Sequence, residues 1–138
     1  MNIKESYSGI LREELVLAAG CTEPIAIAYA AAVARDHLCA MPERLVVNCS
    51  GNIIKNVKSV KIPHTRGSRG IEAAAIAGMV AGDEYQKLEV IEHVTEEQTE
   101  QILDYLTKKI VTVNFVKDVP NLYVEVIAYH GGIAFSDD

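Results

Sequence analysis

Cys21 is the side chain of this sequence best suited to chemistry, because of its setting in Gly20-Cys21-Thr22-Glu23-Pro24. Gly20 suits the left-handed conformation that ends a helix, Thr22 can cap the next helix, and Pro24 fits that helix's first turn. Unpaired N–H groups and the dipole at a helix start favour a thiolate, the form that binds metals or acts as a nucleophile. A cysteine in such a turn is more often a small buried hydrophobic residue. These neighbours instead favour a cysteine that faces a cleft.

A second candidate is the loop at residues 64–70, which contains Arg66 and Arg69 and opens onto a helix of small residues. A glycine-containing loop that leads into a helix N-terminus can bind an anion through its backbone N–H groups, and two arginines strengthen the attraction. An ordinary flexible loop has the same composition, so both interpretations stay open.

The composition indicates one acidic domain with a locally basic segment. The chain has 138 residues, of which 49% are hydrophobic, and this is enough for one core. A formal net charge of −6 argues against nucleic acid or an anionic membrane as a partner. The segment from residue 44 to residue 71 nevertheless lacks Asp and Glu and carries six cations: Arg44, Lys55, Lys58, Lys61, Arg66 and Arg69. This pattern favours a local anion site.

The three cysteines, Cys21, Cys39 and Cys49, form no CxxC pair. They therefore indicate neither a disulfide framework nor a self-contained zinc site. The N-terminus lacks the apolar segment of a signal peptide, and the longest apolar run, residues 25–34, is too short to span a bilayer. We expect a cytoplasmic protein.

The first part of the chain is predicted to be mainly helical. Apolar residues at helical spacing predict an amphipathic helix over residues 3–19, and residues 24–38 predict an alanine-rich helix that is buried on every face. Residues 45–49 are typical of a short buried strand. The apolar residues of 53–62 fit both the helical and the strand spacing. We favour a short helix that runs into an extended segment. A further helix of small residues is predicted over residues 71–82.

The second part is predicted to contain most of the strands. Residues 88–91 fit a short strand, and a capping-box sequence opens a helix over residues 95–109. Residues 111–116 and 122–129 are strand-like and flank a turn at residues 118–121, which predicts a hairpin. Together these elements predict an α+β fold, with helices packed on a small, mostly antiparallel sheet.

Three motifs occur in one order and spacing: residues 20–26 (Gly-Cys-Thr-Glu-Pro-Ile-Ala), residues 50–56 (Ser-Gly-Asn-Ile-Ile-Lys-Asn), and Pro63-X-Thr65 before residues 70–74 (Gly-Ile-Glu-Ala-Ala). Together they resemble the L-cysteine desulfidase family, which is related to the alpha part of iron–sulfur L-serine dehydratases. The resemblance covers nearly the whole chain. Because family members are considerably longer, it implies that residues 1–138 form a single domain, the N-terminal lobe of a longer enzyme.

The resemblance implies a lyase that needs no pyridoxal phosphate (PLP). In this family a [4Fe-4S] cluster acts as a Lewis acid in β-elimination, which converts L-cysteine to pyruvate, ammonia and sulfide, or L-serine to pyruvate and ammonia. Cys21 takes the position of one cluster ligand, and the other ligands belong to the part beyond this chain. Cys39 and Cys49 match no ligand motif and are expected in the core. The chain alone is therefore expected to be inactive and to hold no cluster, and its expected partner is the missing C-terminal part or a companion subunit.

A small amino-acid substrate needs polar contacts to its carboxylate and amine. The residues that we place nearest to these groups are Ser50, Asn52, Lys55, His64, Thr65, Arg66 and Arg69. The general base and the oligomeric state stay open, with a homo-oligomer as one option. The alternative function is a non-catalytic anion-binding or subunit-interaction module in which Cys21 is only packed. Lysine-based PLP chemistry through Lys55 or Lys58 is a third, weaker hypothesis.

Overall fold

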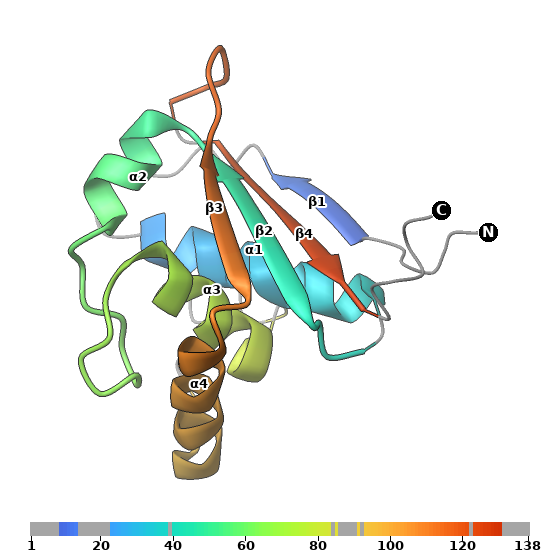
Figure 1. The fold of residues 1–138 in the computed structure, drawn as a ribbon, viewed down its shortest axis with the longest axis vertical. Helices are drawn as coiled ribbons and strands as arrows, with labels where there is room; N and C mark the ends of the chain where they lie inside the picture. Colours follow the sequence, from blue (N-terminus) through green and yellow to red (C-terminus); the bar gives the residue numbers. More distant parts are fainter. Residues whose placement is uncertain are drawn as a thin grey trace.

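The computed structural model describes the backbone of residues 9–13 and, in full, residues 23–38, 40–83, 85, 91, 93–121 and 123–130. The elements follow the order β1 (Gly9–Glu13), α1 (Glu23–Leu38), β2 (Arg44–Cys49), α2 (Gly51–Val57), α3 (Gly70–Ala81), α4 (Glu96–Lys108), β3 (Val111–Phe115) and β4 (Val124–Tyr129) (Figure 1). This architecture confirms the predicted α+β class. No helix in the described part of the chain is long and apolar enough to cross a membrane.

The four strands form one mixed sheet in the order β1-β4-β2-β3. β4 lies between β1 and β2 and is antiparallel to both, whereas β2 and β3 run parallel. Two of the three pairings are therefore antiparallel, as predicted. The central strands β2 and β4 alternate their side chains between the two faces of the sheet, as any strand must.

Helices α1 and α3 cover one face of this sheet, with α1 behind the strands in the view of Figure 1. On that face, Leu45 and Val47 of β2 and Val126 of β4 are fully buried against them. α1 is buried on nearly every side, as its composition predicted, and α3 is as well. These two helices and the inner face of the sheet make the core.

Small residues let α1 and α3 approach closely. A Cβ atom built on Gly78 would lie 2.0 Å from the carbonyl oxygen of Ala28, and one on Gly82 would lie 2.8 Å from the Cβ of Ala32. Both pairs have the same sequence offset, so the two helices run parallel and their first turns lie at the same end. Arg35 joins their far ends, because its guanidinium donates to the carbonyls of Met79 at 2.9 Å and Gly82 at 2.8 Å.

The predicted helix over residues 95–109 is confirmed as α4, together with its capping box. Thr95 Oγ1 accepts from the N–H of Gln98 at 3.1 Å, and the Gln98 side chain accepts from the N–H of Thr95 at 3.0 Å. The predictions for α1, β2 and α3 are also confirmed, and residues 53–62 combine the end of α2 with an extended segment. The predicted strand at residues 88–91 lies outside the described residues except for Ile91, which is in a turn.

The predicted amphipathic helix over residues 3–19 is wrong where the structure describes it, because Gly9–Glu13 form strand β1. Five residues are too few to separate a helical from a strand period. Pairing decides the outcome, since β1 satisfies the backbone N–H and C=O groups along the second edge of β4. The remainder of that predicted helix lies outside the described residues.

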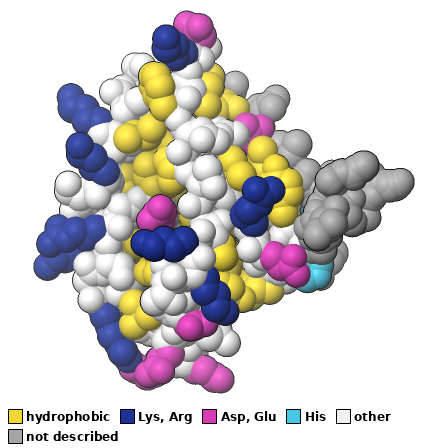
Figure 2. All heavy atoms as spheres, viewed as in Figure 1, with side chains coloured by type: hydrophobic (Ala, Val, Ile, Leu, Met, Phe, Trp, Pro, Cys, Tyr) yellow, Lys and Arg dark blue, Asp and Glu magenta, His cyan; other side chains and the backbone are white. Residues whose placement is uncertain are grey.

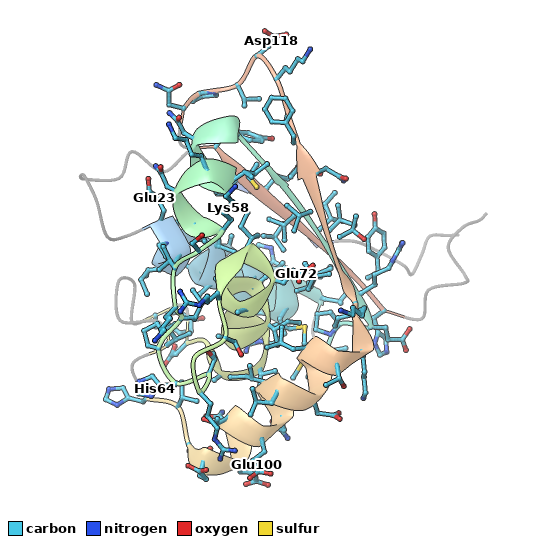
Figure 3. The ribbon with its side chains drawn as sticks, turned by 60° about the vertical axis from the view of Figure 1, so that its left-hand side comes forward. Glu23, Lys58, His64, Glu72, Glu100 and Asp118 are labelled. Atoms are coloured by element: carbon cyan, nitrogen blue, oxygen red, sulfur yellow. The ribbon has the colours of Figure 1, made fainter. Side chains whose placement is uncertain are left out.

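The predicted hairpin is also wrong, although both of its strands exist. β3 and β4 do not pair with each other, because β2 lies between them. The connection projects beyond the end of the sheet, with Asp118 at its tip (Figure 3). It is a long loop rather than a tight two-residue turn, so it does not force its flanking strands to pair.

Candidate functional site

Cys21, the predicted cluster ligand, lies outside the described residues, as do Gly20 and Thr22. The described part of α1 begins two residues later, at Glu23. The Glu23 carboxylate accepts a hydrogen bond of 2.9 Å from the Asn56 side chain in the last turn of α2. The first turn of α1 is thereby attached to α2, and Glu23 and Lys58 lie near each other at this end of α2 (Figure 3).

Ser50, a predicted substrate-binding residue, is the N-cap of α2 and is buried. Its hydroxyl donates to the carbonyl of Asn121 and accepts from the N–H groups of Ile53 and Tyr123, each at 3.4 Å. The side chain therefore joins α2 to the segment that enters β4. All of its hydrogen-bonding capacity is used inside the protein.

The loop at residues 58–70 is a densely hydrogen-bonded turn. Its two arms pair through the N–H of Ile62 with the carbonyl of Ser68, and the N–H of Gly70 with the carbonyl of Val60. Thr65 is fully buried at its centre, and its hydroxyl donates to the carbonyl of Ile62 at 2.7 Å. The positive φ angles of 65° at His64 and 55° at Arg66 show how tightly the backbone turns.

The tip of this loop is attached to the start of α4. Thr99 Oγ1 donates to the carbonyl of His64 at 3.1 Å. The Arg66 guanidinium pairs with the carboxylates of Glu96 and Glu100. These ion pairs are exposed and contribute little stability, but they partly neutralise the charge of Arg66.

Four exposed cations lie on α2 and on both arms of the loop that follows it. Lys55, Lys58, Lys61 and Arg69 are exposed, and none of them makes an ion pair with another described residue. We call these four residues the basic patch. Lys and Arg side chains follow the edge of the molecule where α2 and the loop lie (Figure 2). The Arg69 guanidinium donates to the carbonyl of Ser59 at 2.9 Å, which holds it close to the end of α2.

The structure divides the seven predicted substrate-binding residues into separate groups. Ser50 and Thr65 are buried, and their hydroxyls form hydrogen bonds with backbone groups. His64 and Arg66 lie beside α4, whereas Asn52, Lys55 and Arg69 are exposed on or near α2. The sequence did not reveal the contact between Glu23 and Asn56, because no local pattern indicates that residues 33 positions apart will meet.

Neither the described thiol nor the described acidic and histidine side chains form a metal site. Cys49 is fully buried in the core, as predicted, and this burial raises the pKa of its thiol from 9.0 to about 11. No group of three or more His, Cys, Asp or Glu side chains within the described ranges could hold a metal ion. Cys39 lies outside those ranges.

A hollow of about 240 Å³ lies against α4 and is lined by Met41 and Tyr105, among others. None of the seven predicted substrate-binding residues lines it.

Several bacterial proteins named UPF0597 are similar to this chain. It is 47% identical over 124 residues to one from Finegoldia magna, a match that covers 90% of this chain and 30% of the relative. It is 55% identical over 104 residues to one from Desulfitobacterium hafniense, a match that covers 75% of this chain and 24% of the relative. A relative from Fusobacterium nucleatum is 47% identical over 127 residues, and this match covers 92% of this chain and 30% of the relative.

The chain thus spans about a quarter to a third of the length of these curated relatives. The name UPF0597 states no activity. No family model matches the chain, and no solved structure matches it significantly.

Proposed function

We propose that this chain is the N-terminal part of an iron–sulfur-dependent, PLP-independent lyase that eliminates the β-substituent of L-cysteine or L-serine. The observation that carries the proposal is the 2.9 Å hydrogen bond between Glu23 and Asn56. Glu23 belongs to the motif that contains Cys21, and Asn56 belongs to the motif that begins at Ser50. Motifs that are distant in sequence therefore meet in space, as residues of a shared site must.

The third motif lies at the same end of the molecule. Its second part, residues 70–74, begins α3, which runs parallel to α1, so the first turns of both helices face the same way. Gly70 has a φ of 92°, and a Cβ built on it would lie 3.2 Å from the carbonyl oxygen of Lys58, which favours glycine at this position. The start of α3 is consequently held against the segment that follows α2.

The described residues alone do not fit a [4Fe-4S] cluster. Such a cluster needs several converging thiolates, and Cys49 is a buried thiol whose raised pKa favours the protonated form. In the proposal, Cys21 is one ligand, and cysteines beyond this chain supply the others. A cytoplasmic location fits this chemistry, because thiols stay reduced there.

The basic patch supplies the charge that a substrate carboxylate requires. Lys55 and Arg69 make no ion pair with another described residue, whereas Arg66 faces two carboxylates, so we assign carboxylate binding to Lys55 and Arg69 before Arg66. Ser50 and Thr65 support the site by fixing its backbone. Asn52 is exposed one position after the start of α2 and remains a candidate for the amine.

The test uses a full-length relative, the Finegoldia magna protein, purified without oxygen. We expect iron and acid-labile sulfide in the protein, and pyruvate from L-cysteine or L-serine. Serine at the position that aligns with Cys21 should remove most of the iron and lower the rate at least a hundredfold. Serine at the position of Cys49 is the matched control and should keep both. Absence of bound iron and of pyruvate formation would exclude the lyase.

A non-catalytic anion-binding or subunit-interaction module is the second candidate, and the basic patch favours it. Four exposed cations without ion-pair partners among the described residues can bind an acidic surface without any chemistry. Under this alternative, Lys55→Glu with Arg69→Glu would abolish binding to an acidic partner, while the preceding assay would detect neither iron nor pyruvate.

A further inference from the structure

The second face of the sheet carries no described helix. α1 and α3 lie on the other face, and the strands stand in front of α1 in Figure 1. Alternation along the strands places half of the sheet residues on this side, which no described helix covers and which we call the open face. Its residues are Arg44, Val46 and Asn48 of β2, Thr112 and Asn114 of β3, and Glu125, Ile127 and Tyr129 of β4.

The centre of the open face is apolar. Val46 is in register with Ile127 on one side and with Thr112 on the other, and Ile10 of β1 is in register with Ile127. A sheet face that water covers normally carries polar residues. β4 carries apolar residues on both faces, since Ile127 lies on the open face while Val124 and Val126 are buried on the inner face. Strands of this kind are typical of sheets that are covered on both faces.

Ordered polar groups border this apolar centre. On one side, the Asn114 amide donates to Asn48 at 3.0 Å, and the Asn48 amide donates to Glu125 at 3.1 Å, across three strands. Glu125 is only 8% exposed. On the other side, the Arg44 guanidinium stacks 4.4 Å from the centre of the Tyr129 ring. An apolar centre with a polar border is the usual anatomy of a protein interface.

We infer that the open face is the surface on which the remaining part of the longer relatives packs. These relatives are about three to four times as long as the match, so most of their chain lies outside the segment that resembles this protein. A second layer over the sheet would remove Val46 and Ile127 from water and make a three-layer architecture. The inference rests on the composition of the open face and on the length of the relatives, so it holds whether or not the longer protein is a lyase.

Cysteine labelling tests the inference directly. Thr112→Cys in this chain places a thiol on the exposed part of the open face, and the aligned substitution is made in the full-length Finegoldia magna protein. The rate of maleimide labelling is measured by mass spectrometry on the peptide that contains position 112. We expect labelling at least tenfold slower in the full-length protein. Asn114→Cys provides a second position in case one variant folds poorly.

Glu97→Cys is the matched control, because Glu97 is exposed on α4, away from the sheet. Its labelling rate should change less than threefold between the two proteins. Equal rates at position 112 in the short and long chains would overturn the inference. Protection that disappears on dilution would also overturn it, since the cover would then be a second copy. The assay does not involve iron or pyruvate, so its failure is distinct from failure of the lyase.

Discussion

Ser50 and Thr65 show that polar residues in a motif can act through the backbone. Both hydroxyls were predicted to contact substrate, yet both are buried and bonded to main-chain groups. Residue type alone cannot separate these roles, because a serine that caps a helix and one that binds a carboxylate use the same atom. The exposed cations could be predicted better, since a segment without acidic residues leaves its lysines few local partners.

Cys49 provides a prediction at the level of one residue. Burial raises its pKa from 9.0 to about 11, so the folded protein keeps this proton where the unfolded chain releases it. The free energy of unfolding should therefore fall between pH 9 and pH 11, by about 2–3 kcal/mol. Below pH 9 this contribution is fully present.

The measurement is urea unfolding across this pH range, compared with Cys49→Ala. The variant lacks the thiol but retains every other group that titrates at alkaline pH, so the difference between the two proteins isolates Cys49. That difference should shrink as the pH rises. Parallel curves would show that the thiol does not resist ionisation in the folded state.

Local signals were sufficient for three helices and insufficient for the strand order. The alanine-rich composition of α1 and α3 and the capping box of α4 identified these helices because each signal lies within its own element. The strand order could not be predicted in this way, since β2 pairs with β3 and β4 across more than 60 residues. Nothing in residues 111–129 indicates that another strand will separate them. β1 was missed for the same reason.

The packing of α1 against α3 gives a prediction at the level of elements. Gly78→Ala would place a methyl group 2.0 Å from the backbone oxygen of Ala28, so the helices would have to separate. We expect a loss of at least about 2 kcal/mol in the free energy of unfolding. Gly51→Ala is the control, because its new methyl group meets only the ring of Phe115, which is 58% exposed and able to turn.

Chemical denaturation followed by circular dichroism measures both variants. Gly51→Ala should stay within about 0.5 kcal/mol of the original protein or become slightly more stable, because alanine favours a helix. Equal stability of the two alanine variants would mean that α1 and α3 are not in close contact at Gly78.

The buried residues of the described part of the chain form one continuous core. Its fully buried members include Ile27 of α1, Val47 of β2, Ile53 of α2, Ile76 of α3 and Ile102 of α4. No described element therefore keeps a buried core of its own when its neighbours unfold. This continuity gives physical content to the prediction of a single domain over residues 1–138, because a shared core couples the stability of its elements.

We expect the 138-residue chain to unfold in one cooperative transition, and Cys49 offers a sensitive probe. Its sulfur is fully buried in the central strand β2, so an alkylating reagent can reach it only when that part of the core opens. The free energy of opening calculated from its labelling rate in low denaturant should equal the global value from circular dichroism, within about 0.5 kcal/mol. Cys21 should be alkylated much faster, since we predict a partly exposed thiol at a helix start. A much smaller opening energy at Cys49 would contradict the single domain, because β2 would then separate from α1 and α3 while the rest of the fold persists.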